Sequence, residues 1–268
     1  MGDRLAGKAA VVVGAGQTAG ATIGNGRATA MLFAREGARV LLVDRDADSV
    51  QETLALIEHD APGAASVFVA DIVDEEQCRA IVVHALETLN GRIDVLHNNV
   101  GIGAGDGGPT SLDADAWDRI VDTNLKAMWL TCKHVVPVMR EQGAGAIVNI
   151  SSVAAVAGVG NLTAYKISKA GVNALAQALA VTNARFGIRV NAIMPGLIDT
   201  PMAVDATARA RGVAREDIAA ARARTVPLGH QGTAWDIAHA ALFLASEEAA
   251  FITGVVLPVD GGQSAQVG

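Results

Sequence analysis

Aromatic residues are scarce in this 268-residue sequence, which has three Trp, five Phe and one Tyr although 51% of its residues are hydrophobic. An interior of this composition depends on Ala, Val, Leu and Ile and on close contacts at Gly rather than on rings. The one tyrosine is Tyr165. Any property of a phenol in this protein therefore belongs to that residue.

Cysteine occurs at two positions only, Cys78 and Cys132, which do not form a paired motif. We therefore expect that disulfides do not hold the fold. The six histidines show no metal-ligand spacing, so no metal is expected. Because no secretory leader precedes the first apolar run, a cytoplasmic protein is expected.

The sequence also has no excess of basic over acidic residues and no long apolar run. Lys and Arg number 21 against 28 Asp and Glu, which gives a net charge of −7. This charge repels phosphate backbones and argues against nucleic acid or an anionic membrane as a partner. The longest uncharged stretch, between Glu141 and Lys166, contains polar residues that hydrocarbon does not tolerate, so no membrane span is expected.

Short apolar runs alternate with helical patterns along the chain, which is typical of repeated strand–helix–strand units. Several runs are solidly apolar, which indicates strands buried on both faces of a parallel sheet. The expected strands are residues 9–13, 39–44, 66–70, 93–97, 146–150, 189–193 and 255–259. We predict an α/β fold with a Rossmann-type, doubly wound parallel sheet of seven strands and helices on both faces. No linker interrupts the pattern, so residues 1–268 are expected to form one domain.

Helical periodicity adds detail to this fold. A helix that starts near Arg27 is expected to end at Gly37, a suitable position for a left-handed C-cap. Apolar residues recur at helical spacing over residues 113–139, where the polar Asn124 falls inside the apolar stripe. The Ala- and Arg-rich segment at about 200–226 has no strand pattern and is long for a connection, so a helical flap is expected there.

A glycine-rich turn follows the first expected strand and leads into a helix, with Gly14, Gly16, Gly20, Gly24 and Gly26 in it. Glycines let the backbone approach a ligand, while free N–H groups and the helix dipole stabilise an anionic diphosphate. Ordinary glycine-rich loops contain the same residues, so the pattern alone is weak evidence for a nucleotide site. Its position directly after a strand strengthens it.

The second expected strand ends at Asp44, at a distance from this turn where a carboxylate accepts hydrogen bonds from the ribose hydroxyls of adenosine. A solvated acid at a strand end is the plain alternative. Asp44 would repel a ribose 2′-phosphate, so NAD is favoured over NADP, although Arg45 beside it offsets part of that preference.

Tyr165 and Lys169 lie four residues apart and share one face of a predicted helix. A cation near a phenol lowers the pKa of tyrosine from about 10 toward working pH, which makes Tyr165 a proton acceptor for an alcohol. Ser152, at the end of a strand, is placed to hold the substrate oxygen. The short Tyr–Lys pattern also occurs on surface helices by chance, and it gains weight from Ser152, the glycine turn and Asp44.

Further landmarks accompany these residues at 71–72, 98–101, 124–125, 195–200, 253–254 and 259–262. With them, the sequence resembles the classical short-chain dehydrogenases/reductases from Gly7 to Gly262. The resemblance implies catalytic roles for Asn124, Ser152, Tyr165 and Lys169. It implies cofactor binding by Gly14, Gly24, Asn25, Gly26, Asp44, Arg45, Asp71, Ile72, Asn99, Val100, Gly101, Tyr165, Lys169, Pro195, Gly196, Ile198 and Thr200.

By the same resemblance, Asn124 would support a water that links Lys169 to solvent, with a buried structural Asn as the plain alternative. Two departures from the family pattern remain. The glycine motif is split by about six extra residues between Gly16 and Gly24, which are expected to bulge at the cofactor mouth, where they would alter affinity or contact a partner subunit. Gly20, Gly24 and Gly26 alone also fit the family spacing, so the sequence leaves open which early glycine binds the diphosphate. Val100 stands where the family usually has Ala.

These residues predict an oxidoreductase that interconverts a secondary alcohol and its ketone by hydride transfer, with alcohol oxidation as the expected direction. The candidate pocket residues 101–103, 153–155, 159–162 and Met202 are mostly apolar, which favours a cyclic or otherwise apolar small-molecule substrate. Five arginines of the flap leave recognition of a substrate carboxylate open beside a solvated helix face: Arg209, Arg211, Arg215, Arg222 and Arg224.

Two other classes of function remain open. One is an NADPH-dependent carbonyl or 3-oxoacyl-thioester reductase. The other is a nonenzymatic nucleotide-sensing protein, because a fold alone does not prove activity. The resemblance also implies a homo-oligomer, with a tetramer as the expected state.

Overall fold

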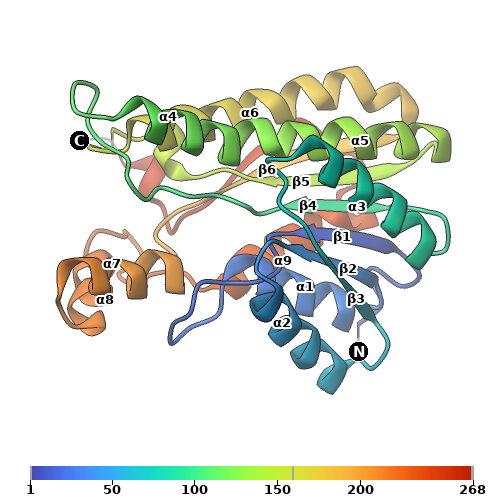
Figure 1. Cartoon of the computed structure of the whole chain (residues 1–268), viewed down its shortest axis with the longest axis horizontal. Helices are drawn as coiled ribbons and strands as arrows, with labels where there is room; N and C mark the ends of the chain where they lie inside the picture. The colour runs from blue at the N-terminus through green and yellow to red at the C-terminus, as the bar shows by residue number, and fades with distance from the viewer. Residues whose placement is uncertain (1, 159, 267–268) are drawn as a thin grey trace.

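The computed structural model describes residues 2–158 and 160–266. Seven strands form one parallel sheet in the order β3-β2-β1-β4-β5-β6-β7 (Figure 1). The strands are β1 (Ala9–Val13), β2 (Arg39–Asp44), β3 (Ala65–Val69), β4 (Val95–Asn98), β5 (Gly145–Ile150), β6 (Ile188–Pro195) and β7 (Val256–Val259). The predicted doubly wound α/β fold is confirmed, and β1 and β2 have the predicted bounds.

Helices cover both faces of the sheet, with α1, α2 and α9 on one face and α3, α5 and α6 on the other (Figure 1). Their bounds are α1 (Asn25–Arg35), α2 (Ala47–Asp60), α3 (Glu75–Thr88), α5 (Ala127–Gln142), α6 (Thr163–Asn183) and α9 (Ala234–Ala245). Beyond α1, Gly37 has a φ of +89°, as expected for the glycine that ends this helix. The chain therefore turns from α1 into β2 within a few residues.

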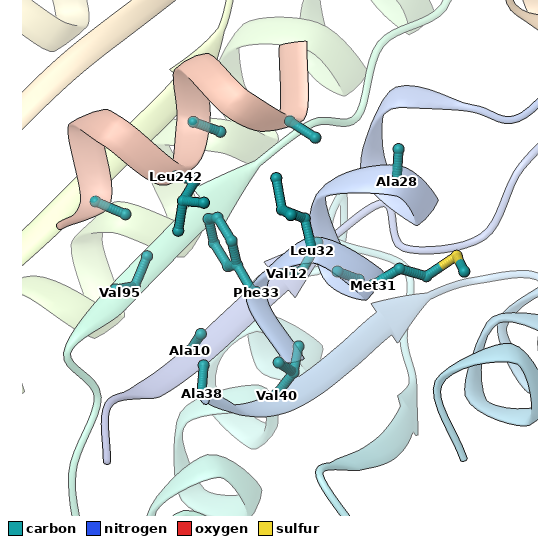
Figure 2. Close-up of a cluster of buried hydrophobic side chains, with 14 of the residues drawn as sticks. Ala10, Val12, Ala28, Met31, Leu32, Phe33, Ala38, Val40, Val95 and Leu242 are labelled. Carbon is teal, nitrogen blue, oxygen red and sulfur yellow. The ribbon is translucent and has the colours of Figure 1, made fainter. Parts of the chain in front are cut away.

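The sheet separates two hydrophobic cores, and alternate residues of β1 enter different ones. Val12 lies in the core beneath α1 and α9, where it is joined by Phe33 and Leu242 (Figure 2). Val11 and Val13 lie in the core on the opposite face. This two-sided burial explains why the strand is apolar throughout, and each such valine contributes about 1.5–3 kcal/mol when fully buried.

The predicted helix over residues 113–139 is present, but it contains a π-helical turn. α4 (Ala114–Val121) and α5 are joined by the turn Asp122–Lys126, which contains Asn124. A π-turn inserts an extra residue into the helix and often marks a functional position.

The segment after β6 is helical, as predicted. A π-turn (Pro201–Asp205), α7 (Ala206–Arg211) and α8 (Arg215–Ala223) stand apart from the layers of the domain (Figure 1). Within residues 2–158 and 160–266, no helix combines the length and apolar character that crossing a membrane requires. Across the same residues, no group of three or more His, Cys, Asp or Glu side chains is arranged to hold a metal ion.

Candidate active site

The predicted site residues gather at the carboxyl end of the sheet. Gly14 follows β1, Asn99 follows β4, Ser152 follows β5 and Gly196 follows β6. β1 has β2 on one side and β4 on the other, so the order of strands reverses there. Ligands of open α/β sheets bind outside the carboxyl ends of the strands at such a reversal.

The glycine turn packs closely around the start of α1. Gly14 has a φ of +81°, and its carbonyl accepts a hydrogen bond from Asn99 Nδ2 (3.2 Å). A Cβ atom on Gly26 would lie 1.9 Å from the Gly14 carbonyl oxygen, so a side chain does not fit there. α1 begins at Asn25, with Gly24 as its N-cap. The split motif is therefore brought together in space, with Gly14 at one end and Gly24 and Gly26 at the other.

The first amides of α1 are available to a ligand. The Gly24 amide donates to Gln17 Oε1 (2.8 Å). In the part of the chain that the structure describes, the Asn25 and Gly26 amides donate to no protein acceptor. Free amides at the positive end of a helix suit an anionic group. The turn therefore fits the diphosphate of a dinucleotide.

The extra residues of the glycine motif contact the flap of their own chain. The Ala21 amide donates to Asp205 Oδ1 (2.9 Å), and Arg209 Nη2 donates to the Ala19 carbonyl (3.0 Å). A Cβ atom on Gly20 would lie 2.7 Å from both Pro201 Cβ and the Asp205 carboxyl carbon. Figure 1 shows this dark blue segment extending from the start of α1 toward α7. It thus ties the cofactor turn to the flap.

Replacing Asp205 by Ala is expected to raise the Kd for the dinucleotide about 5-fold, chiefly through faster dissociation. The change removes the acceptor of the Ala21 amide and the partner of Arg215 Nε (3.3 Å), and one such hydrogen bond is worth about 1 kcal/mol. Fluorescence titration with NADH and stopped-flow displacement would measure both quantities. The control is Asp217→Ala, which removes an exposed carboxylate of α8. Equal dissociation rates in both variants would contradict the link.

Asp44 lies beside the glycine turn, where the ribose of adenosine was predicted. Its Oδ2 accepts from the Gly16 amide (2.9 Å) and its Oδ1 from the Asp46 amide (3.1 Å), so the carboxylate is held at the end of β2. Arg45 Nη1 lies 4.0 Å from Asp71 Oδ2, and both side chains are exposed. A pair of this kind is weak, but it directs Arg45 toward Asp71.

The loop after β4 brings the next predicted residues to the same place. The Asn99 amide donates to the Val13 carbonyl (2.9 Å), which keeps this loop beside the glycine turn. Val100 packs against Gly14, because a Cβ atom there would lie 3.0 Å from Val100 Cγ2. A Cβ atom on Gly101 would lie 2.8 Å from Lys169 Nζ. Glycine at position 101 therefore leaves space for the Lys169 side chain.

Lys169 is a buried cation, with 2% of its surface exposed. Its Nζ donates to the Ile150 carbonyl (2.9 Å) and, at 3.5 Å, to the Val100 carbonyl. No carboxylate of the described residues forms an ion pair with it. Burial lowers the pKa of Lys169 from 10.5 to about 8.

The Ser152 side chain is near enough to the Tyr165 phenol to lower its pKa. Lys169 Nζ lies 5.8 Å from the centroid of the phenol ring. However, burial raises the pKa of Tyr165 above its ordinary value, and the Ser152 side chain only partly opposes this shift. The predicted lowering of the pKa is therefore wrong for this structure. Desolvation of the phenolate is the largest effect on this pKa, and the Lys169 ammonium is engaged by backbone carbonyls.

Asn124 has a visible structural role. Its Oδ1 accepts from the Ile102 amide (2.7 Å), and its Nδ2 donates to the Ile102 carbonyl (2.9 Å) and to Ser168 Oγ (3.1 Å). The side chain is completely buried and ties the loop after β4 to α6. These contacts explain the polar residue in an apolar stripe. The role in holding a water stays a prediction.

The segment after β6 is anchored by the end of the chain. The Gly196 amide donates to the Val259 carbonyl (3.0 Å), and the Leu197 amide donates to Gln263 Oε1 (2.8 Å). Pro195 is the last residue of β6, and a bridge joins the buried Ile198 to Gly232. The Thr200 side chain caps the π-turn that opens the flap.

Comparisons with known proteins identify the family of this chain. A family model described as Enoyl-(Acyl carrier protein) reductase matches residues 20–264. Levodione reductase of Leifsonia aquatica is 38% identical over 243 residues, which are 90% of this chain and 91% of that protein. The chain belongs to the short-chain dehydrogenase/reductase family. A solved structure of levodione reductase has a TM-score of 0.92 and 36% identity, covering 98% of this chain and all of its own.

Two other relatives align with this chain over nearly their whole length. Cis-4-hydroxycyclohexanecarboxylate dehydrogenase of Sinomonas cyclohexanicum is 38% identical over 267 residues, 99% of this chain and 100% of that protein. The 3-oxoacyl-[acyl-carrier-protein] reductase FabG of Thermotoga maritima is 37% identical over 259 residues, 97% of this chain and 98% of that protein. This short-chain dehydrogenase/reductase is therefore an enzyme that acts on CH–OH groups, in a family that uses NAD or NADP.

Three flap arginines of this dehydrogenase/reductase already have partners within the chain. Arg215 pairs with Asp199 and Asp205. Arg222 Nε donates to Gln231 Oε1 (2.6 Å), and Arg209 donates to the insertion as described. The other two, Arg211 and Arg224, are exposed. These contacts support a structural role for the first three guanidinium groups rather than recognition of a substrate carboxylate.

The predicted pocket residues border the Tyr165 ring in part. A Cβ atom on Gly103 would lie 3.5 Å from Tyr165 Cδ2 and 4.0 Å from Leu162 Cδ2. Met202 lies on the flap and is 49% exposed, and Val159 lies outside the described residues. One residue at this site was missed entirely in the sequence: Asp106, whose carboxylate contacts the backbone at the start of α6.

Proposed function

We propose that this enzyme is an NAD-dependent dehydrogenase that interconverts a cyclic or otherwise apolar secondary alcohol and its ketone. The observation that carries the proposal is the grouping of Ser152, Tyr165 and Lys169 beside the loop after β4. NAD, when bound, supplies the hydride acceptor. Tyr165 takes the hydroxyl proton, and Ser152 orients the substrate oxygen. Lys169 holds a positive charge beside the ring and binds the nicotinamide ribose.

The preference for NAD is supported by the position of Asp44. Its carboxylate lies at the end of β2 beside the glycine turn, where it accepts from ribose hydroxyls and repels a 2′-phosphate. The remaining residues from the glycine turn to Thr200 are proposed to line the same dinucleotide, because they meet at one edge of the sheet.

The test uses a cyclohexanol-type substrate with NAD or NADP. The ratio of kcat/KM for NAD over NADP is expected to exceed one and to fall about 10- to 100-fold in Asp44→Ala, since hydrogen bonds to a charged group are worth about 1.5–3 kcal/mol. Asp48→Ala is the matched control, because it removes an exposed acid from the first turn of α2. A ratio unchanged by Asp44→Ala would refute the assignment.

A cyclic substrate is supported by the apolar residues around Tyr165 and by the hydroxycyclohexanecarboxylate dehydrogenase relative, whose name describes a ring compound. The second candidate is an NADPH-dependent 3-oxoacyl-thioester reductase, which the likeness to FabG and the description of the family model favour. Turnover of an oxoacyl thioester with NADPH, and none of ring alcohols with NAD, would select that candidate. Absence of turnover with both, despite binding of nucleotide, would indicate a nucleotide sensor.

We also propose that residues 1–268 act as one domain, that residues 200–226 form a substrate flap, and that the enzyme is a homo-oligomer, with four subunits as the proposed state. Exposed hydrophobic side chains on two adjacent helices support self-association: Trp129 on α5 and Ile167 and Val181 on α6. Small-molecule alcohols and ketones are the proposed substrates.

A further inference from the structure

The start of α6 lacks a local cap. Its N-cap residue is Leu162, which offers no side-chain hydrogen bond to the helix. The first amides of a helix have no partner within the helix and need one from elsewhere. In α6 these amides include that of Tyr165, in the first turn of the helix.

A carboxylate from a distant loop provides the missing cap. The Tyr165 amide donates to Asp106 Oδ2 (2.7 Å), and the Ala164 amide donates to Asp106 Oδ1 (3.1 Å). The Thr163 amide and hydroxyl both donate to the Gly107 carbonyl, at 3.2 and 2.8 Å. Two adjacent loop residues thus satisfy the first three amides of α6.

The capping loop is itself held in place. Asn124 binds both backbone groups of Ile102 at the start of this loop. Arg119 of α4 donates to the Ala104 carbonyl (2.7 Å), and Asp106 Oδ1 also accepts from the Gly107 amide (2.8 Å). A negative charge at the start of a helix is favourable to its dipole as well. The position of this loop therefore fixes the position of the first turn of α6.

We propose that Asp106 is a positioning residue, which holds the Tyr165 phenol in register with Ser152 by capping α6 from the loop after β4. The proposal rests on the proposed role of Tyr165 as proton acceptor. Lys169 lies one turn further along α6 and is held separately, through its own bond to the Ile150 carbonyl and through Ser151 Oγ, which donates to the Lys169 carbonyl (2.9 Å). Loss of Asp106 therefore affects Tyr165 more than Lys169.

The test compares Asp106→Ala, Asp106→Asn and Asp113→Ala. Asp113 caps α4 in the same way, because its carboxylate accepts from the Asp115 and Ala116 amides. In Asp106→Ala, kcat is expected to fall about 10-fold, as for a modest misplacement of a reacting group, while the Kd for NAD changes by less than about 2-fold. Asp106→Asn retains one acceptor oxygen and is expected to recover part of kcat. Asp113→Ala is expected to match the wild type in kcat.

A second readout follows the phenol itself. Tyr165 is the one tyrosine, so ultraviolet difference absorbance during a pH titration reports its ionisation without any turnover. Because burial raises the pKa of Tyr165, a loosened first turn exposes the ring, and the titration midpoint in Asp106→Ala is expected to fall toward that of free tyrosine. Asp113→Ala is expected to titrate like the wild type.

The outcomes separate this proposal from the proposed function. A wild-type titration midpoint and kcat in Asp106→Ala would overturn the role of Asp106. A shifted midpoint with unchanged kcat would support the contact and count against Tyr165 as the base. If Asp106→Ala does not fold, Asp106→Asn decides, since wild-type kcat and titration in that variant would show that the bidentate cap is not required.

Discussion

The Tyr165→Phe variant is expected to lose about 10²–10⁴-fold in kcat, the usual contribution of a positioned acid or base. Phe keeps the ring that packs beside Gly103 and removes the hydroxyl, whose pKa Ser152 lowers. The fold and the contacts of Lys169 are independent of that hydroxyl. Steady-state assays with a ring alcohol and NAD would measure the loss, and fluorescence titration with NADH would show a Kd within about 2-fold of the wild type.

The matched control for this prediction is Gln177→Ala, which changes an exposed side chain on the same helix. Its kcat is expected to equal that of the wild type. Turnover by Tyr165→Phe at the wild-type rate would refute the assignment of the base, since the chain has no second tyrosine to replace it. The same variant provides the baseline for phenol titration.

Replacing Lys169 by Met is expected to lower kcat/KM about 100-fold, because the buried positive charge beside Tyr165 is lost. Met fills a similar volume without a charge. The same change is expected to alter how stability depends on pH. The pKa of Lys169 is 10.5 in the unfolded chain and about 8 in the folded protein, so the unfolded state binds the proton more tightly.

The sign of this effect follows from linkage. Below pH 8 both states carry the proton, and the full cost of burying the charge is present; between pH 8 and 10.5 the cost disappears. The free energy of unfolding of the wild type is thus expected to gain up to about 3 kcal/mol over this range relative to Lys169→Met. Urea denaturation at several pH values would measure it.

The control is Lys126→Met, which removes an exposed lysine that pairs with Asp122 at 3.4 Å. The pH dependence of its stability is expected to follow that of the wild type. Parallel curves for the wild type and Lys169→Met would contradict the burial of a charged lysine. A normal kcat/KM in Lys169→Met would contradict its catalytic role.

The bounds of the strands show where sequence patterns are sufficient. β1 and β2 are predicted to the residue because solidly apolar runs end at a glycine turn and at Asp44. β4 begins at Val95 rather than at residue 93. Just before it, the Asp94 side chain accepts a hydrogen bond from the Ala9 amide (2.8 Å) and pairs with Arg92. β6 extends to Pro195 because it pairs with β7 up to Val259. Pairing between distant strands decides these ends.

The site was predicted from the sequence as a set of residues but not as an electrostatic environment. The sequence-based prediction for Tyr165 considered only the neighbouring cation, Lys169, and therefore expected a lowered pKa. In the structure, burial of the phenol has the larger effect and raises that pKa. Desolvation depends on every group packed around the ring, and these groups come from the loop after β4 and from α6.

The sequence by itself determined the family, the sheet and the identity of the residues at its carboxyl edge, because those follow from local periodicity and short motifs. Only the tertiary structure decided which glycines form the turn, where the inserted residues go and what caps α6. Gly14 contacts Gly26 across the insertion, and Asp106 lies 59 residues before Tyr165, whose amide it binds. Contacts between residues so far apart leave no periodic pattern, since each partner is set by the folded arrangement of the chain.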